Sequence, residues 1–350
     1  MSEDVWSEQD TTPDAIEAAL RELLHQRHAD NPSLAPARVL NLVVIADREW
    51  LGEISNRLER VGRYRASRTI LCTVEKHRQS LDAVMVMSYD ETPGGSLGVI
   101  HEKIEIDLGP EHLPRLDTIV DPVLAAELPT MLWSPHGFHD AVNTLLPMTD
   151  VVLLDSDDHD QDEVGLSKAA ELLERAYVVD LAWLRTTPWR ERLAACFDPR
   201  DRRPALASLE KVSIRHHPLS GPSAGLLAGW LSSRLGWTPA RLSSHNGDGM
   251  LGSLKVGNGH EVEIQLAPVD QEAPGLAGVT VSWSEGALSL DRGSGGLQAH
   301  ECLPDERELA WQILGASRGE GGILGEGVRQ ALLRDRTYGP ALHCALELLP

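Results

Sequence analysis

The chain has 350 residues, of which 42% are hydrophobic and 24% charged, and its formal net charge is −21. This length exceeds one ordinary hydrophobic core, so two domains are expected, and the composition is that of a globular protein rather than a disordered or fibrous one. The negative charge repels phosphate backbones and anionic lipid surfaces, which argues against nucleic-acid and membrane partners.

The sequence also bears on the cellular compartment. No apolar run reaches the roughly 18–20 residues that a transmembrane helix needs, and the acidic N-terminus lacks the layout of a signal peptide. The four cysteines, Cys72, Cys196, Cys302 and Cys344, form no CxxC pair and no zinc-ligand spacing. These features predict a cytoplasmic protein with reduced thiols.

The first half of the chain alternates between helical and strand patterns. Residues 1–12 are expected to be flexible, and residues 11–28 open a helix with Thr12 as its cap and Pro13 in its first turn. The valine-rich run at 37–46 predicts a buried strand, followed by a helix that ends at Gly62 and a strand at 68–75. Residues 81–89 and 99–108 predict an antiparallel pair. This rhythm predicts an α/β domain over residues 13–200, with a mostly parallel sheet flanked by helices.

The remaining segments of this half follow the same alternation. Residues 110–127 are expected to be mostly helical, 128–134 a strand and 135–147 a helix. Residues 150–156 predict a strand, 163–176 a helix and 177–184 a further strand.

Beyond residue 200 the pattern changes to short strands separated by glycine-rich turns. A strand at 209–217 and a helix at 222–236 precede six short strands between 240 and 303, which are typical of an antiparallel meander. Helices are expected at 305–315 and 326–335. We therefore predict an α+β domain over residues 201–350.

Two motifs suggest chemistry. GPSAG, residues 221–225, matches the G-x-S-x-G pattern of hydrolase nucleophile elbows, but the strand does not run directly into Ser223, and a glycine-rich helix start explains the motif better. The acidic run DSDDHDQDE, residues 155–163, lacks the glycine and glutamate positions of a calcium loop and is interpreted as a solvated acidic loop.

Other candidate sites are weaker. His136, His139 and Asp140 fall on one turn of the expected helix but lack further ligands, and His216 and His217 face opposite sides of a strand. The glycines of GEGGILGEG, residues 319–327, follow a helix with the wrong spacing for a dinucleotide loop. The sequence therefore predicts no metal, no cofactor and no catalytic set.

The segment DLAWLRTTPWRERLAACFD, residues 180–198, concentrates tryptophan and arginine. Thr187 and Pro188 predict a helix start, and the apolar positions that follow, among them Trp189, predict one buried face. Trp183 and Arg185 are expected to point outward, in alternation, at the end of the preceding strand, where parallel sheets usually place binding surfaces. Because tryptophan and arginine commonly anchor interfaces, the arginines are candidates for binding.

This segment closely resembles the glucose-6-phosphate dehydrogenase assembly protein family, OpcA. The resemblance also includes ARVLNLVVIA, ASRTILC, LPTMLWS and VVLLDS in the same order, from about residue 13 to 200, and extends more weakly to about residue 335. It implies a non-catalytic cytoplasmic protein that binds glucose-6-phosphate dehydrogenase and favours its active oligomeric state, at the entry to the oxidative pentose phosphate pathway.

The hypothesis for the contact, or for the scaffold beneath it, comprises Trp183, Arg185, Thr186, Thr187, Pro188, Trp189 and Arg190. Two alternatives remain open. One is a sugar-phosphate sensor in which Arg185 and Arg190 clamp the phosphate. The other is a serine hydrolase that uses Ser223.

Overall fold

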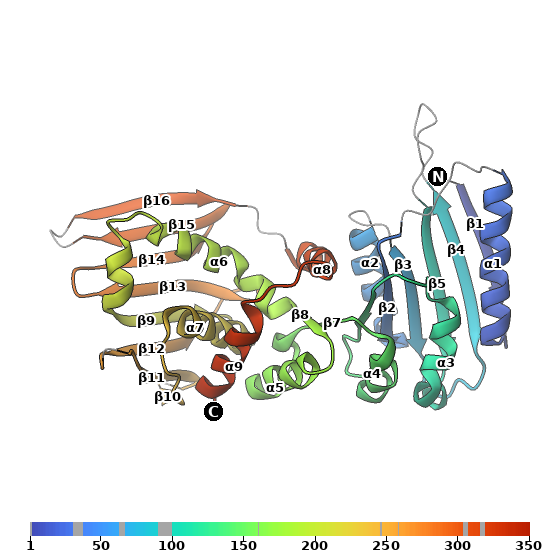
Figure 1. Ribbon diagram of the computed structural model, residues 1–350, viewed down its shortest axis with the longest axis horizontal. Helices are drawn as coiled ribbons and strands as arrows, with labels where there is room; N and C mark the ends of the chain where they lie inside the picture. The colour runs from blue at the N-terminus through green and yellow to red at the C-terminus, as the bar shows by residue number, and fades with distance from the viewer. Residues whose placement is uncertain are drawn as a thin grey trace. The chain divides into compact units, whose positions relative to one another are not determined.

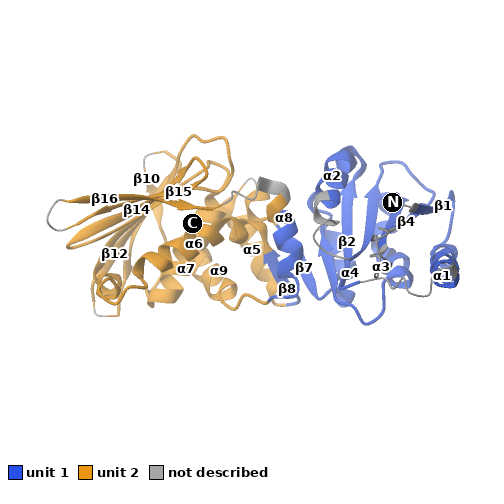
Figure 2. Ribbon diagram, turned by 90° about the horizontal axis from the view of Figure 1, so that it is seen from above, with its two compact units in different colours: residues 1–154, 175–179, 324–333 blue, residues 155–174, 180–323, 334–350 orange. Residues whose placement is uncertain are grey.

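The computed structural model describes residues 2–30, 38–62, 67–89, 100–159, 161–245, 247–257, 259–303, 307–315 and 319–350. The chain divides into two compact units (Figures 1 and 2). Unit 1 comprises residues 1–154, 175–179 and 324–333, and unit 2 comprises residues 155–174, 180–323 and 334–350. The chain therefore passes between the units several times, whereas the sequence predicts a single change near residue 200; that boundary stays a prediction.

Unit 1 is built on an eight-stranded sheet with the order β1-β4-β5-β3-β2-β6-β7-β8. Strands β5, β3, β2, β6 and β7 run parallel, and β4 pairs antiparallel with both β5 and β1. The central strands are buried along their length, as expected for a parallel sheet with helices on its faces. The strands are β1 (Ser2–Glu8), β2 (Leu40–Asp47), β3 (Ser67–Val74), β4 (Asp82–Tyr89), β5 (Ile100–Leu108), β6 (Thr130–Trp133), β7 (Val151–Leu154) and β8 (Tyr177–Asp180).

The helices between these strands begin and end close to where the sequence predicts. Thr12 caps the first helix, since its hydroxyl accepts from Ala15 N at 3.3 Å, and Ile16 and Leu20 are buried. The helices between β1 and β7 are α1 (Pro13–Asp30), α2 (Leu51–Gly62), α3 (Leu116–Val120) and α4 (His139–Leu145).

Unit 2 contains a second eight-stranded sheet, with the order β10-β11-β12-β9-β13-β14-β15-β16. Only β9 and β12 pair in parallel among these strands, and the others form antiparallel pairs. Along β9, Val212, Ile214 and His216 are buried while Lys211 is exposed, so one face of the sheet packs inward. The strands are β9 (Leu209–His216), β10 (Ser243–His245), β11 (Gly249–Lys255), β12 (Glu261–Pro268), β13 (Leu276–Trp283), β14 (Gly286–Gly293), β15 (Gly296–Cys302) and β16 (Glu308–Leu314).

Two helices of unit 2 pack unusually closely. A Cβ at Gly229 of α7 would lie 2.2 Å from the carbonyl oxygen of Ala341 in α9, and one at Gly225 would lie 2.8 Å from Leu349. Glycine at position 229 therefore lets the two helix backbones approach each other, and glycine at position 225 leaves room for the side chain of Leu349, which follows α9. The helices from residue 162 onward are α5 (Asp162–Leu173), α6 (Leu181–Phe197), α7 (Gly221–Leu235), α8 (Gly319–Gln330) and α9 (Tyr338–Leu348).

The predicted fold class is confirmed: the N-terminal sheet is mostly parallel with helices, and the later sheet is an antiparallel meander with helices. Apart from shifts in where elements begin and end, three elements differ from the sequence prediction. Residues 2–8 form β1 where a flexible terminus is expected, residues 308–314 form a strand within the predicted helix 305–315, and α9 was not predicted. In β16 the pairing with β15 decides the conformation, because the apolar residues of ELAWQIL fit a strand as well as a helix.

Candidate functional site

Helix α6 carries the tryptophan–arginine segment and begins well before Pro188. Asp180 is its cap, since Asp180 Oδ1 accepts from Ala182 N at 3.0 Å. Pro188 lies inside the helix and removes one backbone hydrogen bond, at a cost of about 3 kcal/mol. Burial of Leu181 and Trp183 in the added turns offsets that cost. The predicted strand through residue 184 and the predicted cap at Thr187 are therefore wrong.

The residues predicted to bind a partner lie mostly in the interior of unit 2. Five of the seven have buried or nearly buried side chains: Trp183, Arg185, Thr186, Trp189 and Arg190. Thr187 is half-buried and Pro188 is exposed. The expectation that Trp183 and Arg185 point outward is wrong, while a contact between this block and a partner stays a prediction.

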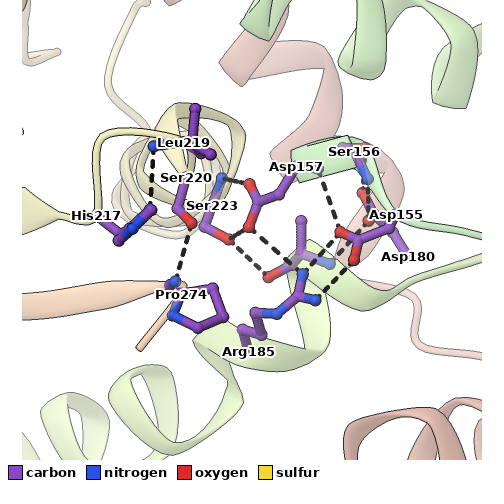
Figure 3. Close-up of polar contacts among 12 residues, drawn as sticks. Asp155, Ser156, Asp157, Asp180, Arg185, His217, Leu219, Ser220, Ser223 and Pro274 are labelled. Atoms are coloured by element: carbon purple, nitrogen blue, oxygen red, sulfur yellow. Dashed lines mark hydrogen bonds and ion pairs between the residues drawn. The ribbon is translucent and has the colours of Figure 1, made fainter. Parts of the chain in front are cut away.

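Arg185 lies among three aspartates, and Figure 3 shows the group that we term the carboxylate cluster: Asp155, Asp157, Asp180, Arg185 and Ser223. The Arg185 guanidinium binds Asp155 through both of its terminal nitrogens, with Nη1–Oδ1 2.7 Å and Nη2–Oδ2 2.6 Å. Its contact with Asp157 Oδ2 is longer, 3.4 Å. A two-point pair of this kind is among the strongest charge-assisted contacts, so Asp155 is the main partner of Arg185.

Asp180 is compensated by hydrogen-bond donors instead of a cation. Besides Ala182 N, its carboxylate accepts from Ser156 N at 3.1 Å, Ser156 Oγ at 2.6 Å and Tyr338 Oη at 3.0 Å. Burial, and then the charge of Asp155, raise the pKa of Asp180 to about 6, and the bonds from Ser156 and Tyr338 oppose that rise. Asp180 thus ties the starts of α6 and α9 to the turn that follows β7.

Asp157 caps α7 from outside the helix. Its Oδ1 accepts from Ser223 N at 3.0 Å, and its Oδ2 lies 2.7 Å from Ser223 Oγ (Figure 3). Ser223 is completely buried in the first turn of α7, after the segment that follows β9. The hydroxyl therefore supports the helix start, as the sequence favours, and its burial removes the access to substrate that a hydrolase nucleophile requires.

The cluster holds three carboxylates and one guanidinium, and Asp157 is the least compensated of the three. Burial, followed by the charge of Asp155, raises the pKa of Asp157 to about 8, although Arg185 and Ser223 lower it. The hydroxyl geometry agrees with a neutral Asp157. Ser223 Oγ lies 3.2 Å from the Ala182 carbonyl oxygen as well as 2.7 Å from Asp157 Oδ2, and it has one hydrogen to donate. A protonated Asp157 donates to Ser223, which leaves the Ser223 hydrogen for Ala182.

Arg190 forms a second group on the same helix. Its guanidinium carbon lies 3.4 Å from the centre of the Trp183 ring, and its nitrogens donate to the hydroxyls of Thr186 and Thr187, both at 2.9 Å. Asp335 accepts from Trp183 Nε1 at 2.9 Å and lies 3.7 Å from Arg190 Nη1. Burial lowers the pKa of Arg190 to about 10, and the charge of Asp335 opposes this. Both arginines are thus engaged within unit 2, so a phosphate clamp would have to displace these contacts.

The interpretation of residues 155–163 as a solvated loop is wrong for its first members. Asp155 and Ser156 are buried and Asp157 is nearly so, while Asp158 is exposed and residue 160 lies outside the described residues. The sequence carried one signal of this arrangement. An acid directly follows or ends each of two neighbouring buried strands, at Asp155 after β7 and Asp180 in β8.

The histidine candidates do not form the expected turn. Helix α4 begins at His139, so His136 precedes it and packs against Trp50, with ring centres 5.6 Å apart. Burial lowers the pKa of His136. Within the part of the chain that the structure describes, no three His, Cys, Asp or Glu side chains are grouped to hold a metal. Residues 319–327 fall within α8 rather than a loop.

Comparison with known proteins identifies the family. Residues 59–171 match the profile described as glucose-6-phosphate dehydrogenase subunit N-terminal domain, and residues 176–342 match the C-terminal domain of the same description. The two matches together cover most of the chain. The chain belongs to the OpcA family of glucose-6-phosphate dehydrogenase assembly proteins.

Individual members of the OpcA family are more distant. The OxPP cycle protein OpcA of Synechocystis sp. is 29% identical over 195 residues, which cover 53% of this chain and 39% of that protein. The protein of the same name from Nostoc punctiforme is 31% identical over 140 residues, 39% of this chain and 30% of that protein. The matched part thus spans well under half of these relatives.

Two of the solved structures that match this chain do so at low sequence identity and with TM-scores below 0.5. KijD10, a 3-ketoreductase from Actinomadura kijaniata, is 11% identical with a TM-score of 0.49, covering 89% of this chain and 95% of its own. The aldose-aldose oxidoreductase from Caulobacter crescentus is 13% identical with a TM-score of 0.48, covering 88% and 95%. These likenesses carry no inference about the function of this chain. None of its described helices is long and apolar enough to cross a membrane.

Proposed function

We propose that this protein binds glucose-6-phosphate dehydrogenase and favours the active oligomeric state of that enzyme, without a reaction of its own. The observation that carries the proposal is the pair of family matches, since both parts of the chain match domains described as belonging to a glucose-6-phosphate dehydrogenase subunit. The name OxPP cycle protein, which the relatives carry, agrees with a role at this enzyme. We place the protein in the cytoplasm.

Such an activator works by differential affinity. It must bind the active oligomer more tightly than the inactive form, because equal affinity for both would leave the equilibrium where it is. A tenfold shift toward the active oligomer requires a preference of about 1.4 kcal/mol, which a few well-placed contacts can supply.

In this proposal the tryptophan–arginine segment acts mainly as a scaffold for the contact. Trp183, Arg185 and Arg190 are engaged by groups of unit 2, which holds α6 in place at its start and its middle. Pro188 and, in part, Thr187 remain accessible on the outer turn of the helix. A rigid helix that presents few exposed residues loses little conformational entropy on binding.

The test measures dehydrogenase activity and oligomer size with and without this protein. The wild type is expected to raise the activity and the fraction of the larger species. Arg185→Ala and Arg190→Ala should weaken both effects, since they loosen α6, whereas Arg241→Ala at an exposed position should not. The proposal fails if the wild type changes neither the activity nor the size of the dehydrogenase.

A further inference from the structure

Strand β16 is an exposed sheet edge with an apolar sequence. It reads ELAWQIL and lies at the end of the unit 2 sheet, beside β15 (Figure 1). Leu309 is 44% exposed and Leu314 is 74% exposed, while Trp311 and Ile313 are half-buried. After Glu308 the strand carries no charged residue.

The other sheet edges are protected in the usual ways. Strand β10 has three residues and β8 has four, and β1 carries three acids in SEDVWSE. Short edges and edge charges prevent unwanted strand pairing. Among the strands that the structure describes, β16 is a seven-residue edge with neither protection beyond its first residue, and its pairing with β15 contains no bulge. We therefore expect another strand to pair with this edge.

The apolar side chains of β16 share one face. Leu309, Trp311 and Ile313 lie opposite Glu301, Ala299 and Leu297 of β15. All three of these β15 residues are buried on the inward face of the sheet. Because residues directly opposite in an antiparallel pair project to the same side, the three apolar side chains of β16 extend the buried face to the edge.

The backbone of β16 has donors and acceptors that point away from β15. Gly293 pairs with Gly296 across the two-residue turn that joins β14 and β15. Residues that flank such a turn bond to each other, so the backbone groups of Gly296 point toward β14 and those of Leu297 and Ala299 point toward β16. The same alternation turns the N–H and C=O groups of Ala310 and Gln312 outward.

We propose that β16 of one copy pairs antiparallel with β16 of a second copy, about a two-fold axis through Trp311. This register pairs all seven residues. It sets Leu309 opposite Ile313 of the partner subunit, and Trp311 opposite Trp311 of the partner subunit, on one continuous apolar face. The outward backbone groups of Ala310 bond to Gln312 of the partner subunit, and Glu308 lies opposite Leu314 of the partner subunit rather than opposite a second Glu308.

The choice of a second copy rests on this internal symmetry. The apolar residues 309, 311 and 313 are placed evenly about Trp311, so the strand is its own complement, as a two-fold interface requires. A register shifted by one residue would set apolar side chains against the opposite face of the partner strand. The contact joins the two unit 2 sheets into one continuous sheet and leaves no apolar edge at β16.

The test measures the mass of the protein alone by analytical ultracentrifugation over a range of concentrations. The wild type is expected to shift from the mass of one copy to that of two. Ala310→Pro removes an outward N–H while sparing the bonds to β15, and Leu309→Lys sets a charge in the apolar row, so both should remain at the mass of one copy. Ser243→Lys adds the same charge at β10, the opposite edge of the sheet, and should behave like the wild type.

Circular dichroism and the Tm of each variant establish that it is folded. The proposal is overturned if the wild type keeps the mass of one copy throughout, or if folded Ala310→Pro and Leu309→Lys variants dimerise as the wild type does. It is equally overturned if the variants lose their effect on the dehydrogenase while the wild type alone never dimerises, because β16 would then serve a different partner. No dehydrogenase is present in the mass measurement, so its result is separate from that of the proposed function.

Discussion

Each unit buries a charged cluster, and the two clusters have opposite excess charge. In unit 1, the fully buried Glu102 lies between two arginines, 2.8 Å from Arg68 Nε and 2.6 Å from Arg38 Nη2. Arg68 also donates to the Val123 carbonyl at 2.8 Å. In unit 2, one guanidinium lies among three aspartates.

The two clusters show how the interior of a protein accommodates an excess of positive charge and an excess of negative charge. A surplus guanidinium stays charged and can donate to backbone carbonyls, as Arg68 does. A surplus carboxylate accepts hydrogen bonds or takes up a proton, and in unit 2 Asp180 follows the first route and Asp157 the second. We therefore expect the buried cluster of unit 2, but not that of unit 1, to make stability depend on pH near neutrality.

The largest expected effect comes from removing the central charge of each cluster. Arg185→Met leaves Asp155 and Asp157 buried without a cation, and Glu102→Gln leaves Arg38 and Arg68 without an anion. Each should destabilise its own unit by about 3–5 kcal/mol at pH 8. At pH 5 the loss in Arg185→Met should shrink because Asp157, whose pKa is raised by burial, can take up a proton, while the loss in Glu102→Gln should not.

Hydrogen exchange of the intact protein, followed separately for the peptides of each unit, distinguishes the Arg185→Met effect from the Glu102→Gln effect. Protection should fall in α6 and α7 for Arg185→Met, and in β2 and β3 for Glu102→Gln. Arg241→Met, at an exposed position, serves as the matched control. An Arg185→Met loss that is identical at both pH values would contradict the comparison.

The next effect is the pH dependence carried by Asp157. Its pKa is raised from 3.8 to about 8, so its contribution to stability is complete below about pH 4 and is lost as the pH rises to about 8. The slope reaches about 1.4 kcal/mol per pH unit, so on the order of 2 kcal/mol should be lost between pH 6 and 8. Urea unfolding across this range should show the decline in the wild type and a nearly flat profile in Asp157→Asn.

Asp157→Asn keeps the shape of the side chain and its amide can donate to Ser223, so the variant is expected to remain folded. Unfolding of the wild type at pH 7 should also release about one more proton than unfolding of the variant. Buffer-dependent calorimetric enthalpies measure that release. Equal release from both proteins would mean that Asp157 is ionised in the folded state.

The smallest effect is expected from Ser223→Ala. The variant loses the hydroxyl that lies between Asp157 and Ala182 but keeps the backbone bond from residue 223 to Asp157. A loss of about 1–2 kcal/mol is expected, as for one buried hydrogen-bonded hydroxyl. Thermal unfolding measures it, and the ability to act on the dehydrogenase should be retained. Loss of that ability at full stability would give Ser223 a role beyond support of α7.

The elements that local patterns specify were predicted well. Thr12 and Pro13 mark the start of α1, and the valine-rich run at 37–46 contains most of the buried strand β2, Leu40–Asp47. In α6 the same rule misled, because Thr187 and Pro188 form a good helix start in isolation. The competing signal was Asp180, whose capping bond and the burial of the following residues set the start earlier.

The candidate site was harder to predict because its partners are distant in the sequence. Asp155 accepts a hydrogen bond from Arg185, thirty residues later in the chain. Asp180 accepts one from Tyr338, which follows all the strands of the meander. A dense run of acids is usually solvated, and only the fold reveals that one arginine and one helix start lie against it. The composition of the segment sets it apart in the sequence, and Trp189 is buried as its helical spacing predicts, whereas Trp183 is buried against expectation.

The close packing of α9 on the glycines of α7 has a consequence for biosynthesis. Leu342, Ala345 and Leu348 are fully buried, so the interior of unit 2 stays open until residues 338–349 have been added. Unit 1 likewise cannot complete its folding before residues 324–333 have been synthesised. Neither unit can therefore complete its folding early on the ribosome, and nascent chains of this protein should depend on chaperones until translation reaches α9.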